Sequence, residues 1–302
     1  MTDSKYLIFS LLLISNYWQL IIGNTPVVIW HGMGDSCCNP LSIGRIQKII
    51  ENNITGVYVH SIKIGHNDEE DIYNSFFKNT NEQIALACDQ LKNDTKLKNG
   101  YHAIGFSQGG QFLRAVAQRC PYPPMRNLIS IGGQQQGVYG FPRCPVNLTK
   151  VCDEIRSLLN FGAYEKFVQQ ILVQAQYWHD PLNEKLYREK SIFLADINQE
   201  INFNPEYREN LLKIKNLVLV KFNKDTMVTP RESEWFGFYK PGQAKVMYEM
   251  EESPLYLNDT IGLQTLDSEG RLFRISIDTD HLRFSDEWFV YNIVDAFLRD
   301  RN

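Results

Sequence analysis

The chain has 302 residues, of which 43% are hydrophobic and 22% are charged, and its formal net charge is −4. This composition is ordinary for a globular protein and excludes a disordered chain, a collagen-like repeat and a coiled coil. Nucleic-acid binders carry a basic excess or a basic stripe, and because this chain has neither, we expect no nucleic-acid partner.

The N-terminus has the pattern of a secretory signal peptide. A lysine precedes an apolar run over residues 6–14, which has the length of a signal-peptide hydrophobic region. Polar residues then interrupt the run before it reaches the roughly 20 residues of a membrane span. Gly23 supplies a small residue for cleavage, with an uncleaved signal anchor as the alternative. We expect residues 1–23 to be a signal peptide, residues 24–302 to form a single domain, and no stable membrane span.

Strand and helix patterns alternate along the first half of the chain. Val27–Trp30 is a continuous apolar run, which predicts a strand buried on both faces of a parallel sheet. Further strands are predicted over 57–59, 101–106 and 128–131, and the helices between them over 43–51, 81–91 and 111–119. This alternation is typical of an α/β fold with a mainly parallel sheet flanked by helices.

The pattern changes after Cys144. From residue 144 to about 212 the apolar spacing is helical and strand patterns are rare, which predicts a helical insertion over the sheet. Strand patterns return over 217–220 and 272–277, and a last helix is expected over 286–298. The insertion therefore precedes the last strands.

A G-x-S-x-G segment, Gly105 to Gly109, lies between a predicted strand and a predicted helix. In that context a strained turn lifts the serine hydroxyl clear of the sheet, as in the nucleophile elbow of α/β hydrolases. The alternative is a plain tight turn with a surface serine. We predict that Ser107 is the nucleophile of an α/β-hydrolase fold.

A serine needs a neighbouring base, and in this fold class an acid and then a histidine follow late strands. Asp225 follows the predicted strand at 217, and His281 follows the strand over 272–277. We predict that His281 is the general base and that Asp225 holds its tautomer. The acid is less certain than the base, because other carboxylates lie near both positions in the sequence: Glu232, Glu234, Asp278 and Asp280.

The tetrahedral intermediate of acyl transfer needs two hydrogen-bond donors for its oxyanion. One donor is expected from the backbone N–H of Gln108, the residue after the nucleophile. The segment His31 to Gly34, after the first strand, is the natural source of the second, and we predict the N–H of Met33.

Six cysteines and four sequons fit a secreted protein. The cysteines are Cys37, Cys38, Cys88, Cys120, Cys144 and Cys152, and three disulfides among six cysteines allow 15 connectivities. Six reduced thiols in a cytosolic enzyme are the alternative. No cysteine has zinc-like spacing, so we expect no metal and no cofactor. The candidate glycosylation sites are Asn53, Asn93, Asn147 and Asn258.

The sequence resembles the palmitoyl-protein thioesterases, in particular the lysosomal type-one members, over nearly the whole mature chain. The resemblance is carried by segments longer than a generic hydrolase motif, which are 31–38 (HGMGDSCC), 105–112 (GFSQGGQF), 131–134 (IGGQ), 177–181 (YWHDP), 191–198 (SIFLADIN), 233–239 (SEWFGFY) and 280–282 (DHL).

The resemblance implies a hydrolase that removes long fatty acyl chains from cysteines of S-acylated proteins during lysosomal breakdown. It places the family's triad on Ser107, Asp225 and His281 and its oxyanion donors on Met33 and Gln108. It also implies three disulfides, namely Cys37–Cys38, Cys88–Cys120 and Cys144–Cys152. The implied substrates are S-palmitoylated proteins or peptides and thioesters of the acyl-CoA kind.

The chain departs from better-known vertebrate members at three of their sequons. The matching positions are Glu189, Asn204, which Pro205 blocks, and Lys224. Glycan-dependent sorting to the lysosome is therefore expected to differ, which makes secretion the alternative to a lysosomal location. Catalysis is not affected by these changes.

Two other functions remain open from the sequence. One is a broader lipase or carboxylesterase, because a serine triad serves oxygen esters and thioesters alike. The other is a catalytically silent binding protein on a hydrolase scaffold, which the intact triad residues disfavour.

For a long acyl chain, we predict a groove lined by Phe167, Ile171 and Trp178, or by their immediate neighbours. The alternative is that these side chains only pack the insertion onto the sheet.

Overall fold

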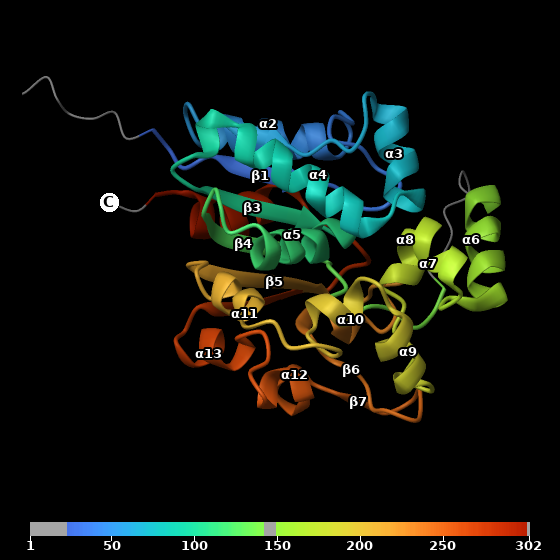
Figure 1. Cartoon of the computed structure of the whole chain (residues 1–302). Helices are drawn as coiled ribbons and strands as arrows, with labels where there is room; N and C mark the ends of the chain where they lie inside the picture. Colours follow the sequence, from blue (N-terminus) through green and yellow to red (C-terminus); the bar gives the residue numbers. More distant parts are fainter. Residues whose placement is uncertain (1–22, 142–148, 301–302) are drawn as a thin grey trace, which may run out of the picture.

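A six-stranded parallel sheet forms the centre of the molecule (Figure 1). The structure is a computed structural model that describes residues 23–141 and 149–300. The strand order is β2-β1-β3-β4-β5-β8, and every neighbouring pair is parallel. The strands are β1 (Val27–Trp30), β2 (Val59–Ser61), β3 (Tyr101–Phe106), β4 (Met125–Ile131), β5 (Asn216–Phe222) and β8 (Leu272–Ile277). This arrangement confirms the predicted mainly parallel sheet flanked by helices.

Helices cover both faces of the sheet. They are α2 (Ile43–Asn53), α4 (Thr80–Asn93), α5 (Gln108–Arg119), α12 (Pro254–Leu257), α13 (Leu263–Ser268) and α14 (Asp286–Phe289), which a further helical segment, Val290–Leu298, continues. Helix α3 (Asp68–Phe77) packs instead against the cluster that contains Ile155 and Val168. In residues 23–141 and 149–300, no helix has the length and apolar character needed to cross a bilayer.

Successive side chains of the central strands point to opposite faces of the sheet and pack into two separate cores. Ile29 and Ile104 pack with α2 and the last helix, whereas Trp30 and Ala103 pack with α4 and α5. Because both faces of the central strands are buried, their sequences read as continuous apolar runs, and for this reason β1 and β3 are found where they were predicted.

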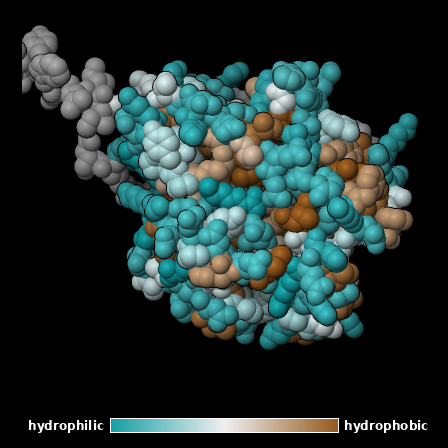
Figure 2. Space-filling model, viewed as in Figure 1, coloured by the Kyte–Doolittle hydropathy of each residue, from teal (hydrophilic) through white to brown (hydrophobic). Residues whose placement is uncertain are grey.

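The regular elements of the described residues 149–215, before β5, are all helices joined by turns and loops. Its helices are α6 (Thr149–Gly162), α7 (Lys166–Ile171), α8 (Val173–Gln176), α9 (Glu184–Lys190), α10 (Leu194–Ile197) and α11 (Pro205–Leu211). Helices α6, α7 and α8 lie beyond one end of the sheet, at the right of Figure 1. Figure 2 shows a largely hydrophilic face with hydrophobic residues gathered over this region, where Phe161 and Phe167 are exposed.

Several elements differ from the predictions. The second strand is Val59–Ser61 rather than 57–59, because Val57 closes a turn with Ile54 and pairing with β1 begins at Val59. Helix α3 was not predicted, since its sequence DEEDIYNSFF has no clear apolar stripe. The small antiparallel pair β6 (Phe238–Tyr239) and β7 (Met247–Tyr248) was also missed, because two-residue strands have no readable period.

Disulfides join Cys37 to Cys38 and Cys88 to Cys120. The second bond ties α4 to the end of α5, and a crosslink closing a loop of this length stabilises a fold by about 2–4 kcal/mol. Cys152 is also disulfide-bonded. Cys144 lies outside the described residues, so the third pairing stays a prediction.

Candidate active site

Ser107 stands on a sharp turn between β3 and α5. Its backbone has φ +53° and ψ −126°, a strained conformation for a residue with a side chain. The turn is so tight that a Cβ on Gly105 would lie 2.3 Å from the backbone nitrogen of Gly110, and one on Gly109 would lie 2.3 Å from the carbonyl oxygen of Trp30. Glycines at these positions therefore permit the elbow that presents the Ser107 hydroxyl.

The three residues predicted as a triad lie in hydrogen-bond contact. Nε2 of His281 is 3.0 Å from Oγ of Ser107, and Nδ1 of His281 donates to Oδ2 of Asp225. Asp225 follows β5 and His281 follows β8, adjacent strands whose carboxyl ends meet at the same edge of the sheet as the elbow. This geometry lets the histidine take a proton from the serine while the carboxylate fixes the ring tautomer.

Asp225 is ionised and firmly held. Its Oδ1 accepts from the backbone N–H groups of Met227 (2.7 Å) and Val228 (2.8 Å). Burial alone would raise the pKa of Asp225, but the hydrogen bonds from His281 and Glu234 and the backbone donors lower it below the ordinary value. Asp225 can therefore accept the proton of Nδ1 throughout the neutral pH range.

Glu234 is a second carboxyl group behind the triad. It is fully buried, and its Oε2 accepts from the backbone N–H of Phe222 at 2.8 Å. Burial, together with the hydrogen bond to the charged Asp225, raises the pKa of Glu234 well above its ordinary value. A Glu234 side chain that is protonated for this reason can donate its proton to the charged Asp225. The sequence analysis left it open as an alternative acid, and the structure places His281 against Asp225 instead.

The two predicted oxyanion donors flank Ser107. Gln108 begins α5, so its backbone N–H has no partner within the helix, and its side chain is fixed by donation to the carbonyl of Ser75. The loop after β1 brings Gly32 against the nucleophile, since a Cβ on Gly32 would lie 3.1 Å from that of Ser107. No described group accepts a hydrogen bond from the N–H of Met33, so both donors can serve a bound oxyanion.

A cavity of about 320 Å³ opens beside Ser107 and His281. Its walls are largely apolar and come from α2, α3, α6 and the loop after β8. The residues that shape it include Ile43, Ile46, Phe76, Val151, Ile155 and Phe284. Such a cavity beside Ser107 suits an acyl chain better than a polar ligand.

The predicted groove residues Phe167, Ile171 and Trp178 do not line this cavity. Phe167 is 62% exposed, and Ile171 and Trp178 pack against the buried cluster that contains Phe76 and Ile155. Ile171 and Trp178 therefore have the packing role that was given as the alternative to a groove. Among their neighbours, Tyr177 does line the cavity. Apolar periodicity located the helices but could not show which face meets the nucleophile.

The sequence analysis also missed a buried ion pair beside the oxyanion loop. The sequence placed His31 only in the loop after the first strand, and Asp71 lies on the helix that was not predicted. Forty residues separate the two, and no spacing rule relates them.

Of the candidate glycosylation sites, Asn93 and Asn258 are exposed, Asn53 is half-buried, and Asn147 lies outside the described residues.

The chain matches the sequence profile of one protein family, described as palmitoyl protein thioesterase, over residues 26–281. It is 55% identical over 273 residues to palmitoyl-protein thioesterase 1 of Caenorhabditis elegans, covering 90% of this chain and 91% of that protein. It is 30% identical over 263 residues to the lysosomal thioesterase PPT2 of Mus musculus, covering 82% and 79%. These matches confirm the resemblance inferred from the sequence.

Among solved structures, the chain is similar to the Bacillus licheniformis lipase BlEst2 in its mature form. The TM-score is 0.46 at 13% identity, covering 92% of this chain and 94% of the lipase.

Proposed function

This chain belongs to the palmitoyl protein thioesterase family and is a thioester hydrolase, and we propose that it removes long-chain acyl groups from cysteines of S-acylated proteins through a Ser107–His281–Asp225 mechanism. The observation that carries the proposal is the 3.0 Å contact between Nε2 of His281 and Oγ of Ser107, at the wall of an apolar cavity.

Acylation begins when His281 takes the hydroxyl proton of Ser107 as its oxygen attacks the thioester carbonyl. The carbonyl oxygen becomes an oxyanion and accepts hydrogen bonds from the N–H groups of Met33 and Gln108. Asp225 stabilises the imidazolium that forms. When the intermediate collapses, the carbon–sulfur bond breaks, His281 protonates the departing cysteine sulfur, and the acyl group remains as an ester on Ser107.

Deacylation repeats these steps with water. His281 removes a proton from a water molecule, the resulting hydroxide attacks the ester carbonyl, and Ser107 leaves after regaining its proton from His281. The products are a fatty acid and the free cysteine of the substrate. No step needs a group beyond the chain's own residues and water.

The cavity is the proposed site of the acyl chain. Each methylene moved from water into an apolar site contributes about 0.8 kcal/mol, so a long chain gains much more binding energy there than a short one. Ile155 is 5% exposed and lies on α6 in the cavity wall. A larger side chain at this position would occupy space that the acyl chain needs.

Ile155→Trp is expected to reduce kcat/KM on a palmitoyl thioester and to spare an acetyl thioester. Displacing about three methylenes corresponds to a loss of roughly 50-fold, whereas the short substrate should change less than about threefold. Rates on palmitoyl-CoA and acetyl-CoA measure the two effects. Ile171→Trp is the matched control, since Ile171 lies in the same insertion but does not line the cavity. Equal losses on both substrates, or no loss on either, would contradict the proposed site.

We propose that the protein reaches the lysosome through the secretory pathway, with secretion as the alternative destination. The proposal is supported by the name of the murine relative, the apolar run near the N-terminus and the exposed sequons at Asn93 and Asn258. N-terminal sequencing of the mature protein should find a start near residue 24. A start at Met1 or Thr2 would contradict both the proposed signal peptide and the proposed secretory route.

A further inference from the structure

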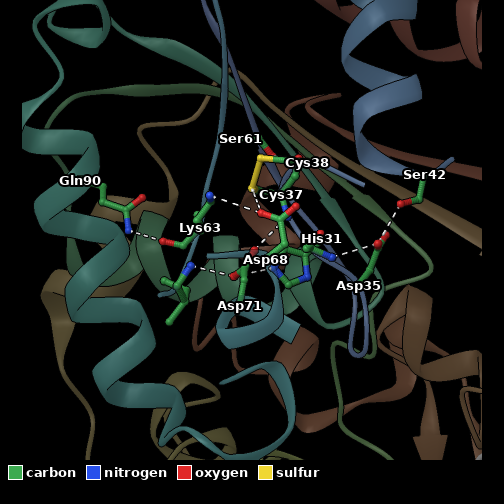
Figure 3. The surroundings of a disulfide bond; sticks show 12 residues. His31, Asp35, Cys37, Cys38, Ser42, Ser61, Lys63, Asp68, Asp71 and Gln90 are labelled. Atoms are coloured by element: carbon green, nitrogen blue, oxygen red, sulfur yellow. Dashed lines mark hydrogen bonds and ion pairs between the residues drawn. A yellow bond between two sulfur atoms is a disulfide. The ribbon is translucent and has the colours of Figure 1, made fainter. Parts of the chain in front are cut away.

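The loop that carries Met33 rests on a buried ion pair outside the triad (Figure 3). Nε2 of His31 lies 3.1 Å from Oδ1 of Asp71, and the two side chains are 2% and 0% exposed. Nδ1 of the same ring lies 2.8 Å from the carbonyl oxygen of Gly32. A carboxylate and a carbonyl can only accept hydrogen bonds, so these two contacts favour a His31 ring that is protonated on both nitrogens, an imidazolium.

Asp71 is held in place from several sides. Its Oδ2 accepts from the backbone N–H of Cys37 at 2.9 Å, and its Oδ1 accepts from that of Ile64 at 2.7 Å. Cys37 is itself fixed by its disulfide to Cys38. Figure 3 shows the His31 ring and Asp71 next to this disulfide. The carboxylate therefore presents its charge to His31 from a fixed position.

The charges of this pair support the same assignment. Burial pulls the pKa of His31 down, but the contact with Asp71 and the Gly32 carbonyl outweigh burial and raise it above the ordinary value. Burial likewise acts against ionisation of Asp71, yet His31 and the two backbone donors keep its pKa low. Asp35 is the other charged group that acts on the ring, and it also favours the protonated form.

The contact with Gly32 fixes the direction of a neighbouring donor. The Gly32 carbonyl and the Met33 N–H belong to one planar trans peptide unit, so they point in opposite directions. His31 and the N–H of Asp35 (3.3 Å) both donate to that carbonyl. The opposite end of the unit, the Met33 N–H, stays without a partner among the described residues and lies on the loop packed against Ser107.

We propose that His31 is a positioning residue of the oxyanion hole. By holding the Gly32 carbonyl, it directs the Met33 N–H toward the oxyanion that forms when Ser107 attacks. The inference rests on the proposed function, since His31 has this task only where Met33 serves as an oxyanion donor.

Two amide substitutions separate this role from a structural one. The amide nitrogen of asparagine falls near the position of Nδ1, so His31→Asn keeps a donor for Gly32. That of glutamine falls near Nε2, so His31→Gln keeps a contact with Asp71 and loses the donor to Gly32. Removal of one oxyanion donor costs about 10²–10³-fold in kcat.

We expect His31→Gln to lower kcat on palmitoyl-CoA by about 10²-fold with little change in KM, and His31→Asn to retain about ten times more kcat than His31→Gln. His31 does not line the cavity, so the affinity of both variants for palmitate should match that of the wild type. Equal kcat losses in the two variants, or weaker palmitate binding with unchanged kcat, would overturn the proposal.

The protonation state of the wild-type ring gives a second test that needs no variant to fold. Nitrogen-15 NMR at pH 7 should show the ring assigned to His31 with both nitrogens protonated, at a pH where an ordinary histidine is mostly neutral. His179 needs its own assignment, because it lies between the carbonyl of Gln136 and the carboxylate of Glu184. A mostly neutral His31 ring would overturn the proposal. Wild-type turnover and its loss in Ser107→Ala test the proposed function separately, so a defect confined to the His31 variants bears on this inference alone.

Discussion

Ser107→Ala is expected to abolish turnover of palmitoyl thioesters while the protein stays folded. The substitution removes the atom that forms the acyl-enzyme and leaves His281, the oxyanion donors and the cavity in place. Loss of the nucleophile from a serine triad lowers kcat on the order of 10⁴-fold or more. Alanine keeps the Cβ that the strained turn already accommodates, so the thermal midpoint should stay within a few degrees of the wild-type value.

The measurement is steady-state hydrolysis of palmitoyl-CoA and of an S-palmitoylated peptide. Ser268→Ala is a suitable control, because Ser268 is exposed on α13 and its hydroxyl bonds only to the carbonyl of Thr265. Its activity should equal that of the wild type. A Ser107→Ala enzyme that keeps more than about one per cent of the wild-type kcat would rule out the proposed nucleophile.

Asp225→Asn is expected to lower kcat on palmitoyl thioesters nearly as much as Ser107→Ala does. Oδ1 of asparagine can still accept from Met227 and Val228, so the loop should keep its shape. The amide nitrogen would then face Nδ1 of His281 and favour the wrong ring tautomer, and the imidazolium of the transition state would lose its counter-charge. In serine enzymes with this constellation the same change lowers kcat by about 10⁴-fold.

The matched control for this change is Asp278→Asn. Asp278 is 71% exposed, lies three residues before His281, and pairs with Lys224 at the surface. An exposed ion pair contributes little to stability or catalysis, so activity should change by less than about twofold. If the Asp225 and Asp278 variants had similar activities, the carboxylate at Asp225 would not act on the base.

The sequence predicted the parts of this site that follow from local rules. A strand buried on both faces has a continuous apolar run, so β3 was predicted with its observed bounds. Glycines around Ser107 mark a turn that only small neighbours permit. Asp225 and His281 were predicted from their position after late strands, because parallel strands deliver their carboxyl-terminal loops to the same edge of the sheet.

The parts that depend on packing between distant segments were not predicted. Ile171 and Ile155 are both apolar residues on helical stripes of the insertion, and only the tertiary structure shows that Ile155 faces the cavity. Asp225 was predicted as the triad acid, but the nearby Glu234 stayed an alternative that only the position of the His281 ring in the structure could decide. The pairing of His31 with Asp71 joins residues 40 positions apart, one of them on a helix without a clear pattern.

The measurement that tests the central claim most directly is covalent trapping with a long-chain alkyl phosphonate, which forms a stable adduct with an activated serine. After complete inhibition, mass spectrometry of the digested protein should find one adduct, on the peptide that contains Ser107. Pre-incubation with palmitoyl-CoA should slow its formation. An inhibited protein that carries the adduct on another residue, or a thioesterase that remains fully active with Ser107 modified, would contradict the account.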